Sequence, residues 1–197
     1  MNTADDTPFF LIGNSIVADF VNTLAQRENQ PLELLPDWNA VVAWAVATGT
    51  IDARHVASLR RAVSARWHTR AVQLRATLRD ALEQFSRVGT MSAATLAAIN
   101  DELGATPLVA RLQQKNDSVL LSLAPQEINP AALLALIARH AAELFASVDH
   151  HRVRRCSGQS CVLWFHDTSK NNARRWCSME GCGNRSKVST HYHRHKA

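Results

Sequence analysis

Long apolar runs, glycine and proline are all scarce in this sequence. No stretch approaches the ~18 apolar residues that a membrane-spanning helix requires, so we expect no membrane partner. The start carries two aspartates where a secretory signal would carry positive charge. Only 7 glycines and 6 prolines occur among 197 residues, whereas alanine is abundant, which favours helices. We therefore expect a mainly helical cytoplasmic protein whose thiols stay reduced.

The sequence also lacks the motifs of the common enzyme classes. It contains no P-loop, no glycine-rich nucleotide motif and no pair of acids arranged for acid–base chemistry. A lone histidine, His140, lies in an expected apolar helix, where it is normally satisfied by local contacts. We therefore expect that the protein is not an enzyme.

Acidic residues are nearly absent from one end of the chain. Residues 150–197 hold ten lysines and arginines but only two acids, a surplus of eight positive charges. Residues 1–149 hold twelve basic and fifteen acidic side chains, a deficit of three. All four cysteines also lie in the cationic segment. This asymmetry predicts an anionic partner for one end only and two modules, 1–149 and 150–197.

Apolar periodicity predicts that the first module is helical with one small hairpin. Helical spacing extends over residues 16–24, 38–48, 52–88, 93–103 and 130–148. Two β-prone runs flank Lys115-Asn116-Asp117 and predict a hairpin within 106–125, and a short strand is expected at 9–12. The predicted class of this module is therefore mainly α with a small β-hairpin (α+β).

A polar set lies on one side of the first predicted helix. It consists of Asp19, Asn22 and Thr23, followed by Gln26. Such residues either line a pocket for a small-molecule effector or face solvent and cap neighbouring elements. The sequence leaves both interpretations open.

The four cysteines form two short pairs, Cys156-x4-Cys161 and Cys177-x4-Cys182, with fifteen residues between the pairs. Structural zinc takes four ligands at the corners of a tetrahedron, and thiolates serve well. Each pair brings two sulfur atoms towards one point, and the intervening segment returns the chain. Glycines near the pairs permit the tight turns that this requires. We predict one structural Zn²⁺ per chain, held by Cys156, Cys161, Cys177 and Cys182.

Other uses of these cysteines fit the pattern less well. Disulfides need an oxidising compartment, a redox pair is usually C-x-x-C, and the spacing differs from the ferredoxin patterns. Catalytic zinc is disfavoured because four thiolates leave no position for water. His166 and the alternating His191, His193 and His195 offer replacement ligands or a second metal site.

The C-terminal segment resembles the CGNR zinc-finger family, which is named for the string that stands here as Cys182-Gly183-Asn184-Arg185. The triplet Arg175-Trp176-Cys177 belongs to the same resemblance. The preceding residues, through Asp19, Asn22 and Thr23, resemble the ABATE domain, which usually precedes this finger and is described as a stress-induced transcription regulator. The resemblance implies a bacterial transcription regulator of the stress response that binds zinc through the four cysteines.

A treble-clef-like finger would present a basic C-terminal helix that begins near Cys182. Trp164, Phe165 and Trp176 are expected to form its small core, and Asp167 to pair with Arg175 or Arg185. The predicted contacts with double-stranded DNA are Arg174, Arg175, Asn184, Arg185, Lys187 and Arg194.

A single small finger binds DNA weakly, so specific binding would need a homodimer. The first module could supply this dimer and could also sense a small-molecule effector. The alternative function is a zinc-stabilised interaction module that docks an acidic protein partner without binding DNA.

Overall fold

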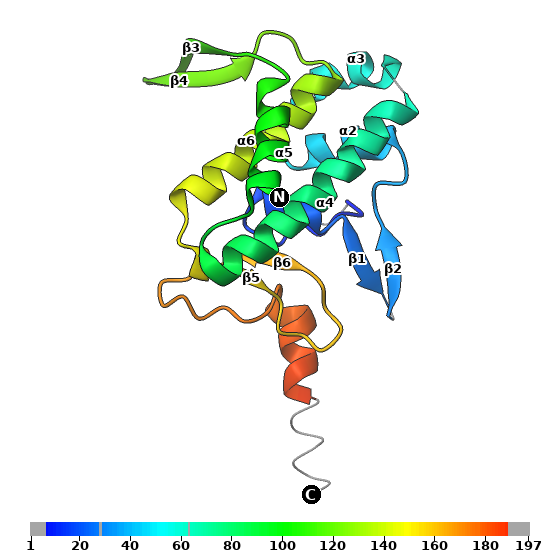
Figure 1. Cartoon of the computed structure of the whole chain (residues 1–197), viewed down its shortest axis with the longest axis vertical. Coiled ribbons are helices and arrows are strands. Elements are labelled where there is room, and N and C mark those ends of the chain that lie inside the picture. Colours follow the sequence, from blue (N-terminus) through cyan, green and yellow to red (C-terminus); the bar gives the residue numbers. More distant parts are fainter. Residues whose placement is uncertain (1–6, 28, 63, 189–197) are drawn as a thin grey trace, which may run out of the picture.

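The computed structural model describes residues 7–27, 29–62 and 64–188. Within these ranges a bundle of helices makes up most of the molecule, and three two-stranded antiparallel sheets are attached to it (Figure 1). The predicted class, mainly α with small β elements, is confirmed. No helix in the described ranges combines the length and the apolar character needed to cross a membrane.

Helices and short strands alternate along the chain. In sequence order they are α1 (Ile16–Val21), β1 (Leu24–Arg27), β2 (Gln30–Glu33), α2 (Trp38–Ala47), η2 (Ala53–His55), α3 (Val56–Arg61), α4 (Ala65–Val88), α5 (Ala93–Gly104), β3 (Leu108–Lys115), β4 (Ser118–Pro125), α6 (Pro130–Ser147), η3 (His150–Arg152), β5 (Val153–Arg155), β6 (Trp164–His166) and η4 (Met179–Gly183). The last described residues, 184–188, are helical.

Helix starts coincide with capping residues that are visible in the sequence. The Asp37 carboxylate accepts a hydrogen bond from the Ala40 amide at 2.8 Å and opens α2. Asn129 accepts one from the Ala132 amide at 2.9 Å, and the proline that follows it fits the first position of α6. The predicted helices 38–48 and 130–148 and the hairpin within 106–125 are confirmed.

Three local predictions were wrong. Residues 9–12 form no strand, and the helix predicted over 52–88 is broken, because Ser64 is extended (φ −152°, ψ 144°) ahead of α4. The first helix ends at Val21, after which β1 and β2 pair, with Leu24 opposite Glu33. This unexpected hairpin is anchored by a distant residue.

Arg75 on α4 is the anchor of the β1–β2 hairpin. The residue is only 3% exposed, and its guanidinium donates two hydrogen bonds to the Glu33 carboxylate, at 2.6 and 2.5 Å. It also donates to Thr23 Oγ1 at 3.0 Å. Because Arg75 is buried, its charge needs the Glu33 carboxylate as a partner, so the hairpin and a residue 42 positions away along the chain depend on each other.

The main core is formed by α1, α2, α4 and α6. The Phe20 and Trp44 rings pack in a tilted arrangement with 4.9 Å between their centroids, and Trp38 Nε1 donates to the Leu59 carbonyl at 2.9 Å. In helix α6, residues 132–138 are all buried. Two residues of the C-terminal module, Val153 and Trp164, belong to this same core. The two modules therefore share apolar contacts.

Candidate metal centre

The four cysteine sulfur atoms meet at one point in the C-terminal module, all within 4.8 Å of one another. Cys161 Sγ lies 3.8 Å from Cys177 Sγ, which lies 3.6 Å from Cys182 Sγ. Four sulfurs at about 2.3 Å from one ion, in a tetrahedron, are roughly 3.8 Å apart. A disulfide would instead require about 2.05 Å. The arrangement fits a tetrahedral four-thiolate metal site.

Short loops place the sulfurs. The Cys156 amide donates to the Leu163 carbonyl at 2.8 Å and closes the loop between β5 and β6, within which the Cys161 amide donates to the Gly158 carbonyl. A Cβ atom at Gly158 would lie 3.1 Å from Cys182 Sγ, so glycine leaves room for the sulfur. In the second pair, the Ser178 hydroxyl accepts from the Gly181 amide at 3.0 Å and caps η4.

Hydrogen-bond donors point at the sulfur atoms. The amides of Gly158 and Cys177 donate to Cys156 Sγ at 3.4 and 3.3 Å. Arg185 Nη2 donates to Cys182 Sγ at 3.0 Å, and this hydrogen bond raises the pKa of the guanidinium. Such donors stabilise thiolates in metal centres and partly offset their charge.

The sulfurs lie too close together for all four to ionise without a cation. The hydrogen bond from Cys161 lowers the pKa of Cys156 to about 2, and the same contact raises the pKa of Cys161 to about 12. The contact with Cys156 also raises the pKa of Cys177. A divalent ion would offset this repulsion, because all four groups bind metal as thiolates.

The core of the finger differs from the prediction. Phe165 is fully buried and packs with the cysteines and Leu163, and Trp176 lies at the edge of that cluster. Trp164, the neighbour of Phe165 on β6, joins the main helical core instead. Successive strand residues face opposite sides of a strand, so β6 contributes Phe165 to the core of the finger and Trp164 to the main helical core.

Asp167 is the buried acid of the finger, with 0% exposure. Its Oδ1 accepts from the Ser169 amide at 2.9 Å and from the Ser169 hydroxyl at 2.6 Å, and Oδ2 accepts from the Arg174 amide at 2.9 Å. The guanidinium beside it belongs to Arg154, 3.7 Å away. The prediction that Asp167 pairs with Arg175 or Arg185 was therefore wrong, because Arg154 occupies that position.

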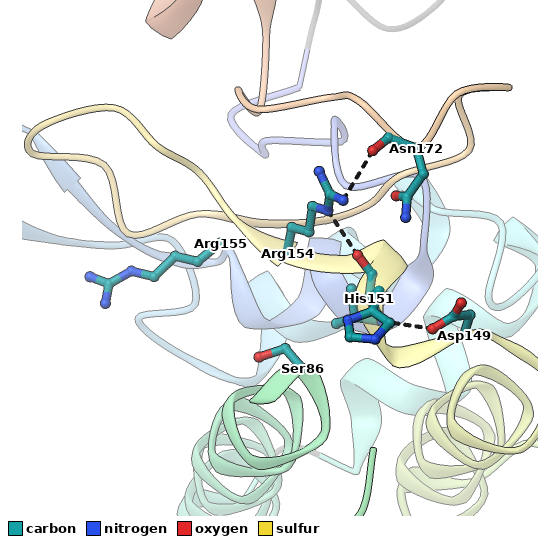
Figure 2. Close-up of a pocket in the computed structure, with 7 residues that line it drawn as sticks. Ser86, Asp149, His151, Arg154, Arg155 and Asn172 are labelled. Carbon is teal, nitrogen blue, oxygen red and sulfur yellow. Dashed lines mark hydrogen bonds between the residues drawn. The ribbon is translucent and has the colours of Figure 1, made fainter. Parts of the chain in front are cut away.

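Some arginines of the finger bind backbone carbonyls. Arg154 donates to the carbonyls of His151 and Asn172 at 2.8 and 3.0 Å, whereas Arg155 extends away from them (Figure 2). Arg174 donates to the carbonyls of Trp176, Ile12 and Cys177, and its guanidinium carbon lies 4.3 Å from the Phe165 ring centroid. These two side chains hold the loops of the finger together.

The other predicted DNA contacts lie on the surface. Arg175, Asn184, Arg185 and Lys187 are exposed or half-buried. Arg194 and the histidines of the tail lie outside the described residues. The structure thus separates Arg174, whose donors are engaged inside the protein, from the surface members of the predicted set.

The polar set on the first helix joins the two modules. Asn22, 1% exposed, forms paired hydrogen bonds with the Trp164 backbone: Oδ1 accepts from its amide at 2.8 Å, and Nδ2 donates to its carbonyl at 2.9 Å. Asp19 Oδ1 accepts from the Gly13 amide at 2.7 Å, and the Gly13 carbonyl accepts from the His166 amide at 2.7 Å.

Thr23 is also internally bonded, to the Phe20 carbonyl at 2.6 Å and to Arg75. The polar atoms that a ligand at Asp19, Asn22 and Thr23 would need are therefore engaged by the protein itself. Their sequence pattern alone could not reveal this role, because the main partner, Trp164, lies 142 residues from Asn22.

Loss of the Asn22 side chain should weaken the junction between the modules. Asn22→Ala leaves the buried amide and carbonyl of Trp164 without partners, and we expect it to lower the free energy of unfolding by about 2–4 kcal/mol. The matched control is Asn14→Gly, which removes an exposed amide that donates to His166 and Thr168, suits the positive φ of 52° at this position, and should cost less than about 1 kcal/mol. Urea denaturation of both variants measures the loss in free energy of unfolding. Equal losses in the two variants would contradict the prediction.

Comparison with known families agrees with this architecture. Two family models match a helical domain followed by a four-cysteine finger, in that order along the chain. Residues 14–148 match the family ABATE, described as "Putative stress-induced transcription regulator", and residues 152–195 match the CGNR zinc finger. No match to a curated protein was found.

The ABATE match covers more than half of the chain, so the protein belongs to the ABATE family, and it carries a CGNR zinc finger after that domain. The predicted resemblance is confirmed. Neither family is an enzyme family. The division of the chain into the modules 1–149 and 150–197 stays a prediction.

Proposed function

We propose that this protein regulates transcription by binding double-stranded DNA through a finger that one Zn²⁺ stabilises. Cys156, Cys161, Cys177 and Cys182 would hold the ion, whose role is structural because four thiolates fill its coordination sphere. The observation that carries the proposal is this sulfur cluster within a segment that has a surplus of eight positive charges. A four-thiolate zinc site has a net charge of about −2, so most of that surplus is left for an outside anion.

The proposed DNA-binding surface consists of side chains on the outside of the finger. Arg175, Asn184, Arg185 and Lys187 stay in it, and Arg155 and Lys170, which also lie at the surface, are added. Arg174 is left out because its guanidinium binds three carbonyls. Arg194 belongs to the proposal by its position in the basic tail. Basic side chains of this kind bind phosphates and position a protein on the duplex.

The helical domain would sense a signal and contribute to a homodimer. An apolar cavity among α4, α5 and α6 supports sensing; Phe85, Ile99 and Phe145 line it. The Phe85 ring also contacts His150 at 6.2 Å between centroids, and His150 begins the short η3 turn ahead of β5. A small apolar effector in this cavity would therefore contact Phe85, whose ring packs against the segment that leads into the finger.

Charge reversal on the finger tests DNA binding. Arg175→Glu with Lys187→Glu should weaken binding of genomic DNA fragments at least tenfold and lower the log–log slope of affinity against salt by about 0.9 for each phosphate that is no longer bound. The control is Arg61→Glu, an exposed arginine on α3. Fluorescence anisotropy between 50 and 300 mM salt, roughly the range over which counterion release acts strongly, measures both quantities.

Zinc content must stay at one per chain in both variants, so that a loss of binding reports on the interface with DNA and not on unfolding. Equal weakening in Arg61→Glu would contradict the proposed surface. No salt-dependent binding by the native chain would favour the alternative, a module that docks an acidic protein.

A further inference from the structure

The β3–β4 hairpin carries most of the large apolar side chains that are exposed within residues 7–27, 29–62 and 64–188. It projects from the helical body at the end opposite the finger (Figure 1). Its exposed apolar side chains, with their exposed fractions, are Leu112 (75%), Leu121 (69%), Val119 (67%), Leu120 (47%), Leu123 (44%) and Val109 (36%). Surfaces of this kind commonly mark contacts with other proteins.

The strand register sorts these residues onto two faces. Leu112 lies opposite Leu121, Ala110 opposite Leu123, and Gln114 opposite Val119. Directly opposed residues share a face, so Ala110, Leu112, Val119, Leu121 and Leu123 lie on one mainly apolar face, which we name the leucine face. Gln114 lies at its outer end, and Leu108 and Pro125 lie at its base. The other face carries Arg111 and Leu120, together with Ser122 and Ala124, which are half-buried. Beyond its base, where Pro125 is buried and Leu108 half-buried, every residue of the leucine face is exposed.

Two properties of the leucine face fit a second copy of itself. It carries no charged residue, so two identical faces meet without repulsion although the chain has a net charge of +5. Its large side chains offer on the order of 500 Å² of apolar surface per copy, so two copies bring together about 1,000 Å², the size at which a specific interface begins. A nucleic acid or an acidic protein would require positive charge that this face lacks.

We propose that the protein forms a two-fold symmetric homodimer in which the leucine faces of two β3–β4 hairpins pack against each other. A two-fold contact uses the same patch on both copies, and the paired leucines of one face meet those of the other. The hairpin and the finger lie at opposite ends of the molecule, so the contact leaves both fingers accessible (Figure 1). The inference rests on the proposed regulatory function only for the reason why a dimer would be useful. The contact itself is argued from the leucine face.

Sedimentation equilibrium of the full-length, zinc-loaded chain tests the dimer. The native protein should approach twice the mass of one chain in the micromolar range, with little dependence on salt. Leu112→Ser with Leu121→Ser should raise the dissociation constant of the dimer at least tenfold, because it removes the central pair of the leucine face. The matched control, Leu120→Ser, removes an exposed leucine from the opposite face and should keep the native dimer.

A measurement on the native chain guards against a variant that fails to fold. Amides of residues 108–125 should exchange hydrogen more slowly at concentrations above the dissociation constant than below it. A native chain that stays monomeric up to 100 μM, roughly the upper end of weak specific association, overturns the proposal, as does equal weakening in Leu120→Ser. Because no DNA is present, failure of the dimer and failure of DNA binding are separate results.

Discussion

Removal of the metal from the purified protein is expected to unfold the finger while α4 and α6 keep their structure. The finger's own core contains little beyond the four cysteines, Leu163 and Phe165. A unit of this size buries too little apolar surface to fold alone. Structural zinc contributes about 10–16 kcal/mol to small zinc domains, more than such a core can replace.

Hydrogen exchange measured with and without a strong chelator gives the test. The amides of Cys156, Cys177 and His166, all hydrogen-bonded in the structure, should lose protection, and added Zn²⁺ should restore it. The native chain should contain about one zinc per molecule. Cys177→Ser should behave like chelated protein, whereas Ser160→Ala, exposed between the first two cysteines, should behave like the native protein. A metal-free chain with full protection, or cysteines joined as disulfides, contradicts the zinc site.

Asp167, which is buried, and Asp19, which is half-buried, should respond in opposite directions to the same substitution. Asp167→Asn should destabilise the zinc-loaded protein by about 3 kcal/mol, since an amide nitrogen would face the Arg174 amide and the Arg154 guanidinium, both of which are donors. Asp19→Asn should stabilise it at pH 8 by about 2 kcal/mol, because the asparagine carbonyl can still accept from Gly13 and no charge is buried. Two effects of the same sign would contradict this prediction.

The pH dependence of stability follows from these two groups. Burial raises the pKa of Asp19 from 3.8 to about 6. The stabilisation of the folded state by this group is therefore present below about pH 4 and is lost as the pH rises through 6. Burial alone would raise the pKa of Asp167, but hydrogen bonds from Ser169 and Arg174 lower it below 3.8, so its contribution is lost only in acid. Urea denaturation at pH 5 and pH 8 should show the gain from Asp19→Asn mainly at pH 8.

Local signals in the sequence predicted the elements that depend on neighbouring residues. Asp37 and Asn129 mark helix starts because a cap acts within three residues, and the cysteine spacing brings four sulfurs together because each pair closes a short loop. The β1–β2 hairpin was not predicted, since Arg75, which anchors it, lies 42 residues from Glu33. A pattern in one segment carries no information about a partner so far along the chain.

The sequence indicated which polar residues matter, but it did not reveal which partners they bind. Asn22 stood out in the sequence as part of a polar set, but its partner is the backbone of Trp164, which any residue other than proline could supply. Arg174 and Arg175 are adjacent and chemically identical, yet only Arg174 reaches the carbonyls of Ile12 and Cys177. Tertiary structure alone distinguishes an arginine that holds a loop from one that faces solvent.

The alternation of Trp164 and Phe165 along β6 limits how this finger can be exchanged between proteins. A chimaera that received residues 150–197 on an unrelated host would expose the Trp164 indole and leave its backbone without the Asn22 carboxamide. The graft would retain its metal ligands but would be prone to aggregation. A successful transplant must therefore carry α1 with the finger, so the smallest transferable unit is discontinuous in sequence.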